Sequence, residues 1–558
     1  MVGTSATVYA QDAAPKATAT HGSNSAADYG HGASQQAGAR VRWLAHQPRP
    51  AADDPCVVEP PAMNPAAARV VSGGHQYQRP KLRWSLDSPC LQLSLPLSAT
   101  IRGDVVNSYA VDADRNVYAH GGSVSPQLRV GAILDSGRFF DDVVLHVEYE
   151  HDLLTGATGG GAGTLGTAFP DAQGLRHELR KAYVRITTRD APAAATMAFG
   201  YQTSHWGLGL VANDGAHGWT PGSGRFSDPR SGDRVLRMQI GLISKPLAML
   251  AVVNADFLDQ DLLSDDDVLL AGDSAAQFSG ALLFGVRQPS QGGIYVAYRK
   301  QQDVRGNTIH ALAIDVAGKA SLKIDNVDVL VEGEFAFITG DTQLGASPAF
   351  PNQSIQQLGA ALRATAGVGK IGGAFDFLFA SGDRNPDDGA QNGFRVDPNY
   401  EMGLMLFRQV MAAQTARGGF RAADPTLVGV PAAGVERIAT RQSPTNTVSL
   451  FPRVWWRPSD GFDVYGGPLF AFAPVDQIDA FNTRIAGGQS RNALNGTAGQ
   501  YLGTELDLGS RYRLNVADVE GTLGVEGGVL FPGSAFEGAQ GEGLGAVYGG
   551  RAKLAIKL

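Results

Sequence analysis

Residues 327–337 read V-D-V-L-V-E-G-E-F-A-F, and their apolar and acidic side chains alternate along the chain. Only a β-strand points successive side chains to opposite faces, so this period of two predicts a strand. One face carries valine and phenylalanine, and the other carries Asp328, Glu332 and Glu334. Carboxylates do not belong in a hydrophobic core. The strand must therefore separate an apolar medium from water, and few folds permit that.

The same alternation recurs along the chain, with glycine, proline, asparagine and aspartate clustered between the repeats. It is clear in 143–150, 181–187 and 235–242, and it is weaker in 91–101, where Pro96 cannot donate to a strand ladder. Further strands are predicted at 279–287, 293–301, 309–324, 358–379, 402–410, 446–457, 463–472, 501–516, 519–531 and 544–558.

Composition supports strands that cross a membrane. The chain has 558 residues, of which only 18% are charged, yet no run of 18 to 20 apolar residues could form a transmembrane helix. Low charge without such a helix is typical of a transmembrane barrel, whose lipid-facing residues alternate with polar ones. We therefore predict an all-β, antiparallel, up-and-down transmembrane β-barrel. At about 26 residues per strand with its connections, it has about 18 strands, and 16 fits almost as well.

Two regions are expected. Residues 1–80 form a low-complexity N-terminal segment, and residues 81–558 form the barrel. The sequence Val8-Tyr9-Ala10 before Gln11 fits the small-x-small rule of signal peptidase, so we interpret it as the remnant of a secretory signal. Cys56 and Cys90 could pair in an oxidising periplasm or stay as unrelated thiols, and the sequence leaves both open.

Three groups of residues resemble the alginate-export family of bacterial outer-membrane barrels. The first is Leu502-Gly503-Thr504-Glu505-Leu506-Asp507-Leu508, followed by Arg511-Tyr512-Arg513 and Leu530-Phe531-Pro532-Gly533. The second is 380–389, A-S-G-D-R-N-P-D-D-G, with its trailing 397–400, D-P-N-Y. The third is 178–184, E-L-R-K-A-Y-V, followed by Gly200-Tyr201-Gln202 and Trp206-Gly207, although Tyr201 stands where the family usually has an arginine after the glycine. The resemblance implies passive export of an acidic polysaccharide through a pore lined with basic residues.

Charged residues on the polar faces of many strands are consistent with such a lining, because guanidinium groups bind carboxylates bidentately. A second interpretation is that these residues form ladders of arginine and glutamate that brace the barrel wall, and both interpretations stay open. Trp455, between two arginines, is a candidate for stacking on a sugar ring. The predicted pore-lining residues are Lys181, Arg185, Arg237, Arg299, Arg453, Trp455, Arg457, Glu505, Asp507, Arg511 and Arg513.

Three other patterns have simple structural explanations. Asp383, Asn385 and Asp387 place oxygen atoms at alternate positions, which is a spacing that can bind Ca²⁺ or can form a solvated turn. Apart from this candidate, no cofactor is expected. Trp206, just after a strand, is interpreted as an aromatic anchor at the membrane interface. The glycine pattern at 161–166 lacks the following helix of a dinucleotide fold and is interpreted as a loop.

No catalytic motif is recognisable, so we do not expect an enzyme. The net charge of −8 argues against a nucleic-acid partner. The expected location is the bacterial outer membrane, and the expected partners are its lipid, a polysaccharide or a small anionic solute, and periplasmic export proteins. The favoured function is passive export of an anionic polysaccharide. The alternatives are a diffusion porin for small solutes and a plugged structural or enzymatic barrel.

Overall fold

The computed structural model describes residues 83–86, 91–118, 122–140, 143–155, 157–158, 175–188, 193–215, 234–259, 272–286, 288–345, 347–459, 461–516 and 519–558. The predicted N-terminal segment, the signal remnant, both cysteines and the glycine pattern at 161–166 lie outside these residues. Most of the described chain is in strands.

The strands up to the middle of the chain are β1 (Arg83–Leu86), β2 (Leu91–Ser94), β3 (Leu97–Val106), β4 (Tyr109–Ala110), β5 (Val117–Tyr118), β6 (Ser123–Phe140), β7 (Val143–Thr155), β8 (Ala157–Thr158), β9 (Leu175–Thr188), β10 (Ala193–Thr203), β11 (Arg234–Ser244), β12 (Met249–Asp259), β13 (Ser274–Phe284) and β14 (Ser290–Gln302). The later strands are β15 (Thr308–Ile324), β16 (Val327–Thr342), β17 (Gln353–Val368), β18 (Ile371–Ala380), β19 (Ala390–Gln391), β20 (Thr447–Ser459), β21 (Phe462–Phe472), β22 (Tyr501–Val516), β23 (Val519–Pro532) and β24 (Val547–Lys557). The helical segments are η3 (Leu406–Met411), α2 (Ala412–Ala422), α3 (Pro425–Val428), η4 (Val435–Arg437), α4 (Ala480–Ile485) and η5 (Ser534–Phe536).

The main sheet closes on itself. Within the described residues, its wall is the eighteen strands β3, β6, β7, β9 to β18 and β20 to β24, each antiparallel to its neighbours. The last strand pairs with the first, from Gly549 opposite Val106 to Lys557 opposite Ser98. Closure pairs the backbone groups of every strand, which is the condition for a sheet in lipid. The predicted antiparallel barrel and its strand number are confirmed.

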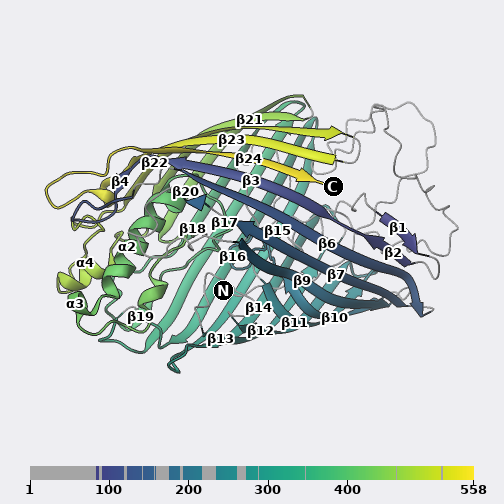
Figure 1. Cartoon of the computed structure of the whole chain (residues 1–558), viewed down its shortest axis with the longest axis horizontal. Coiled ribbons are helices and arrows are strands. Elements are labelled where there is room, and N and C mark those ends of the chain that lie inside the picture. The colour runs from purple at the N-terminus through teal and green to yellow at the C-terminus, as the bar shows by residue number, and fades with distance from the viewer. Residues whose placement is uncertain are drawn as a thin grey trace.

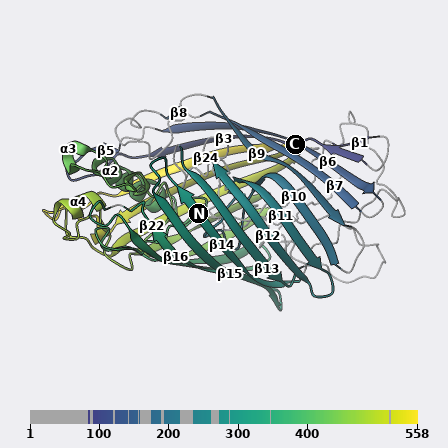
Figure 2. The same cartoon turned by 90° about the horizontal axis from the view of Figure 1, so that it is seen from below.

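The two ends of the barrel differ. Consecutive strands are joined by short turns, such as 325–326 and 369–370, at the end where the chain stops, whereas long connections such as 381–446 and their helices gather at the other end (Figures 1 and 2). Outer-membrane barrels have short periplasmic turns and longer extracellular loops. The helical end is therefore the extracellular one.

The outer wall is apolar, as the alternation predicts. On β16, the Phe335 side chain points outward and is 47% exposed, whereas its neighbour Glu334 points inward and is 4% exposed. Phe199, Val253 and Phe278 are among the large apolar side chains that the outer wall exposes. An apolar shell around a closed sheet needs lipid as its solvent. The protein is thus an outer-membrane β-barrel of a bacterium.

The structure corrects three sequence-based boundaries. The segment 358–379 is not one strand but parts of β17 and β18, which turn at Gly369, whose φ of +58° favours glycine. The segment 402–410 is not a strand at all, because it enters the π-helix η3. Pro96 interrupts the first strand between β2 and β3, although both halves pair with β6. No helix of the described residues is long and apolar enough to cross a membrane.

Among the described residues, two of the connections fold far into the barrel. The first follows β10 and comprises 204–215, and the second is 381–446, between β18 and β20. Their apolar side chains, including Leu208, Leu210, Phe394 and Leu406, belong to one buried cluster with Leu469 and Leu530 of the wall. The largest hydrophobic core of the described residues therefore lies inside the lumen. We name these connections the first and the second inner segment.

Candidate functional site: the lumen constriction

The first inner segment, 204–215, is attached to the wall through buried carboxylates. Glu334 of β16 accepts the main-chain N–H groups of Leu208 and Leu210, the latter at 3.1 Å. Asp315 of β15 accepts the indole N–H of Trp206 at 3.1 Å. Trp206 is therefore buried inside the barrel, and its interpretation as an anchor at the membrane interface is wrong.

Glycine makes this close approach possible. Gly207 has a φ of +56°, and a Cβ atom there would lie 2.6 Å from a carboxylate oxygen of Glu334. A second close approach occurs on β14, where a Cβ at Gly293 would lie 2.9 Å from the Trp206 ring. Both positions need the absence of a side chain, and the segment could not lie against this wall otherwise.

The second inner segment, 381–446, is attached in the same way on the other side. Glu505 of β22 accepts the N–H groups of Leu404, Met405 and Leu406, the last two at 2.8 and 2.9 Å. These amides precede and open η3, and the free N–H groups at the start of a helix favour a negative partner. Gly403, with a φ of +73°, turns the chain immediately before them.

The two inner segments also bind each other. The main-chain N–H of Asp397 donates to the carbonyl oxygen of Leu210 at 2.9 Å. The side-chain amide of Asn399 donates to the carbonyl oxygen of Asn213 at 3.4 Å. A connected structure thus crosses the lumen from β16 to β22, and we name it the constriction.

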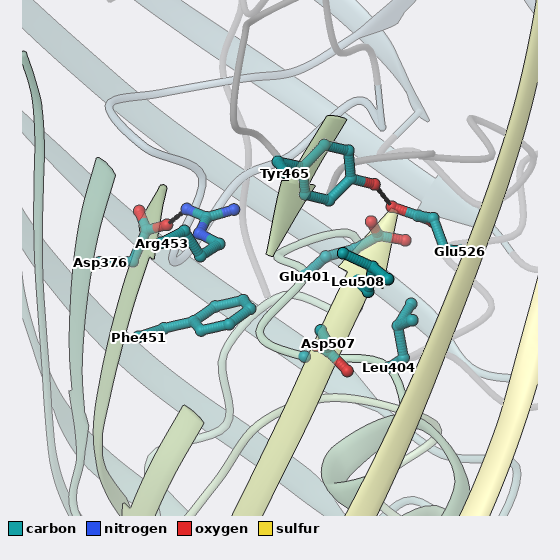
Figure 3. Close-up of a pocket in the computed structure, with 10 residues that line it drawn as sticks. Asp376, Glu401, Leu404, Phe451, Arg453, Tyr465, Asp507, Leu508 and Glu526 are labelled. Atoms are coloured by element: carbon teal, nitrogen blue, oxygen red, sulfur yellow. Dashed lines mark hydrogen bonds and ion pairs between the residues drawn. The ribbon is translucent and has the colours of Figure 1, made fainter. Parts of the chain in front are cut away.

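A small cavity lies beside the constriction (Figure 3). Its volume is about 20 Å³, which is room for about one water molecule. Charged and aromatic side chains face it from several strands and from the second inner segment. The lining residues are Asp376, Glu401, Gly403, Leu404, Phe451, Arg453, Tyr465, Asp507, Leu508 and Glu526.

Most charges around this cavity are paired. Asp376 accepts from Arg453 and, at 2.6 Å, from Arg363. Glu401 binds Arg408 of η3 and, at 3.3 Å, Arg551 of β24. The Glu401 pairs tie the second inner segment to β24, and the Asp376 pairs join β17, β18 and β20 of the wall.

Two acids of the lining are only partly satisfied. Glu526 is 3% exposed, and although one of its oxygens accepts from the Tyr465 hydroxyl, the other has no hydrogen-bond partner among the described residues. One oxygen of Asp507 is also without a partner there. The cavity therefore offers acceptors to a water molecule or to a passing polar group.

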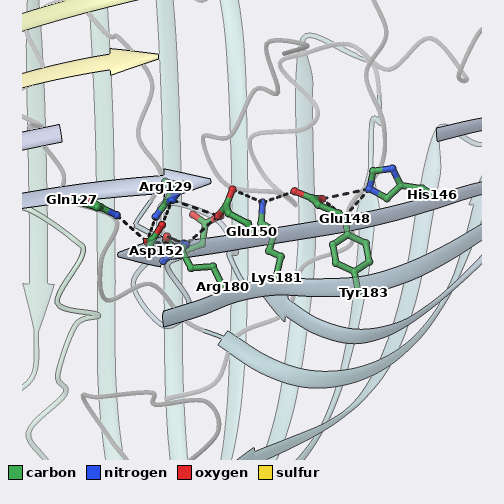
Figure 4. A network of polar contacts seen from close by, with 10 residues as sticks. Gln127, Arg129, His146, Glu148, Glu150, Asp152, Arg180, Lys181 and Tyr183 are labelled. Atoms are coloured by element: carbon green, nitrogen blue, oxygen red, sulfur yellow. Dashed lines mark hydrogen bonds and ion pairs between the residues drawn. The ribbon is translucent and has the colours of Figure 1, made fainter. Parts of the chain in front are cut away.

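The predicted residues on the earlier strands lie inside the wall and are largely braced. Lys181 of β9 lies 3.0 Å from Glu148 and 3.8 Å from Glu150 of β7, in a row of alternating charges (Figure 4). Arg237 of β11 binds Asp256 of β12 through two nitrogens, at 2.6 and 2.8 Å. Arg185 and Arg299 are also buried on the inner side.

The predicted residues on the later strands are spread along the lumen. Within this set, Arg453 and Asp507 line the cavity, Glu505 holds the second inner segment, and Arg511 binds Asp463 at 2.7 Å. Trp455 is buried, with the Arg457 guanidinium 6.0 Å from its ring centre. Arg513 is half-buried on β22 beyond Arg511, toward the periplasmic turns. Their role as a conducting lining stays a prediction.

Sequence reasoning missed the inner segments themselves. Trp206, Leu208 and Glu401 carry no signal of an inward fold, because each meets a wall residue 109 or more positions away in the chain. The inward position of Glu526 is predictable from the sequence, because Glu526 alternates with outward Val525 on a predicted strand.

The predicted calcium loop is folded as a series of turns. The Asp383 carboxylate accepts the N–H of Asn385 at 2.9 Å, and the Asn385 side chain accepts the N–H of Asp387 at 3.2 Å. Burial raises the pKa of Asp383, which disfavours its charged form. The described residues contain no group of three His, Cys, Asp or Glu side chains suited to a metal. Calcium binding stays a prediction.

Comparison with known proteins gives structural neighbours only. No family model matches the chain, and no curated protein does. OccK5 (OpdH) of Pseudomonas aeruginosa aligns with a TM-score of 0.44 and 11% identity over 83% of this chain and 98% of that one. OprD of the same species aligns with a TM-score of 0.44 and 11% identity over 83% of this chain and 94% of that one. OccK2 (OpdF), solved with glucuronate, aligns with a TM-score of 0.44 and 11% identity over 83% of this chain and 98% of that one. The alginate-export resemblance is not confirmed.

Proposed function

We propose that the protein is a passive channel for small hydrophilic solutes across the outer membrane. The constriction supports this proposal most directly, because two inner segments held by Glu334 and Glu505 span the lumen and leave beside them a cavity of about 20 Å³. A sugar polymer needs the path to stay open while its whole length passes, whereas a small solute can pass when side chains move briefly. This favours the small-solute porin over polysaccharide export.

The charges support selectivity by sign. Basic side chains on many strands led us to expect a preference for anions, and we keep that preference as a proposal, now for a small anionic solute. The cavity beside the constriction weakens the preference for anions locally, because the cavity lining holds four carboxyl groups and one guanidinium. Charged groups in a narrow, partly dry pore select strongly, so the sign is measurable. Periplasmic export partners stay a prediction.

The dependence of the permeation rate on solute size tests whether the protein is a channel for small solutes. Purified protein in liposomes is offered a monosaccharide, a disaccharide, a tetrasaccharide and a polyuronate, and the rate of vesicle swelling or uptake is measured. We expect the rate to fall steeply with size and the polymer to be excluded. Entry of the polymer would restore polysaccharide export, and no flux of any solute would indicate a plugged barrel.

The reversal potential in a salt gradient tests the sign. We expect the wild type to favour chloride over potassium, and replacement of Arg453 and Arg457 by glutamate to reverse the preference. Heat-dependent gel mobility shows whether the double variant is folded. Selectivity that does not change would assign both arginines to bracing, and a wild-type cation preference would contradict the anion proposal while leaving the channel in place.

A further inference from the structure

Two histidines meet on the outer wall of the barrel, away from the constriction. His151 on β7 and His177 on β9 lie with the Nε2 of the first 3.5 Å from the Nδ1 of the second. Their ring centres are 5.7 Å apart. His151 is half-buried and His177 is exposed, so both can be reached from outside.

A β-bulge creates this pair. On β9, Lys181 lies opposite Glu150 and Leu179 lies opposite His151, so Arg180 is an extra residue. An extra residue shifts the alternation by one, so the residues of β9 before the bulge change faces relative to those after it. As a result, Arg180 and Lys181 both point inward. Without the bulge, His177 would share the inward face of Lys181. With it, His177 lies diagonally across from His151, within reach on the same face.

The distance suits a metal ion better than a hydrogen bond. Nitrogen atoms that share a proton usually lie about 2.7 to 3.2 Å apart. Two imidazole nitrogens bound tetrahedrally to zinc at about 2.0 to 2.1 Å lie roughly 3.3 to 3.4 Å apart. The observed 3.5 Å is close to that separation. Tyr149 lies parallel to the His151 ring, with centres 6.2 Å apart.

We propose that His151 and His177 bind one divalent late-transition metal ion, such as Zn²⁺ or Cu²⁺, on the outer wall. Imidazole nitrogen is a preferred ligand of these ions. Two nitrogens come from the protein, and water or a phosphate oxygen of the surrounding lipid completes the coordination. The ion joins β7 to β9 across the bulge, where the regular ladder is interrupted.

Copper titration of the full-length protein in detergent tests the site. Electron paramagnetic resonance of bound Cu²⁺ reports the number of nitrogen ligands. We expect a two-nitrogen signal in the wild type, and its loss with at least tenfold weaker binding at this site in His177→Gln and His151→Gln. The matched control is His310→Gln, because His310 is another histidine of a barrel strand and lies 3.7 Å from Asp341 instead of from a histidine.

A second measurement protects the test against effects on folding. Zn²⁺ should raise the unfolding temperature of the wild type and of His310→Gln, and should not raise that of either variant of the pair. Heat-dependent gel mobility confirms that each variant forms the barrel. The proposal is overturned if the wild type shows no two-nitrogen signal, or if His177→Gln retains it.

Discussion

The Glu505 carboxylate on β22 accepts the main-chain N–H of Met405 at 2.8 Å, so the wall itself holds the second inner segment in place. The two residues are 100 positions apart in the chain. The same carboxylate binds the amides on either side of Met405. One buried side chain thus fixes the start of η3 across the lumen, and we expect the width of the path to depend on it.

Replacement of Glu505 by alanine should therefore widen the channel. Three amides lose a charged acceptor, and each charged hydrogen bond contributes about 1.5 to 3 kcal/mol. We expect a larger single-channel conductance and uptake of larger sugars in liposomes. The control is Glu520→Ala, an inward, half-buried glutamate of the neighbouring strand β23, near its periplasmic end. Equal conductance in the wild type and Glu505→Ala would show that the second inner segment does not limit the flow.

The attachment of the first inner segment can be weakened at one atom. Trp206→Phe keeps an aromatic ring against Tyr295, but it removes the N–H that binds Asp315 and leaves a buried acceptor unsatisfied. The expected cost is about 1 to 3 kcal/mol. Amide hydrogen exchange of 206–212 should become faster, while exchange in β22 stays unchanged. Phe278→Leu on the lipid face is a matched aromatic control. Unchanged exchange in 206–212 would mean that packing alone holds the segment.

Bracing of the wall can be separated from conduction at Arg237. This guanidinium and Asp256 are both fully buried and bound through two hydrogen bonds. Arg237→Leu removes the guanidinium from a buried carboxylate that keeps only the Gln277 amide, at 3.1 Å. Loss of the charged partner costs about 3 to 5 kcal/mol, and Asp256→Leu in addition should recover much of it. Urea unfolding in detergent measures the free energy of unfolding of the single and the double variant. If Arg237→Leu alters ion selectivity but not stability, Arg237 serves conduction instead.

A pH effect is expected at the extracellular helices. Asp479 caps α4 by accepting the N–H of Asn482 at 2.7 Å, and burial raises its pKa to about 6. A carboxyl whose pKa is raised by folding destabilises the fold once it is charged, so stability around α4 should fall as pH rises from about 4 to about 6. Two pKa units correspond to about 3 kcal/mol as an upper bound.

Asp479→Asn tests this effect, because asparagine caps a helix as well as aspartate does but carries no charge. Hydrogen exchange of the α4 amides should slow on acidification from about pH 7 to about pH 4 in the wild type, after correction for the intrinsic rate. The variant should show little of this change. A variant that keeps the full pH dependence would place its origin in another group.

The sequence predicts the wall better than it predicts the interior. Alternation identifies Glu334 as inward and Phe335 as outward, because strand geometry is local and lipid imposes it on each residue. The inner segments follow no such local rule. Leu208 reaches Glu334 across 126 positions. The run from Leu404 to Met411 is mostly apolar because it belongs to the luminal core, not because it faces lipid. Trp206 was misplaced for the same reason.

The shared hydrogen bond between Leu210 and Asp397 has a consequence for gating. Movement of either inner segment breaks this hydrogen bond and removes a partner from the other segment. Displacement of one segment therefore lowers the energy barrier to displacement of the other. Single-channel recordings should then contain one dominant opening step instead of two independent conductance sublevels. Substitution of either Glu334 or Glu505 should change that same opening step.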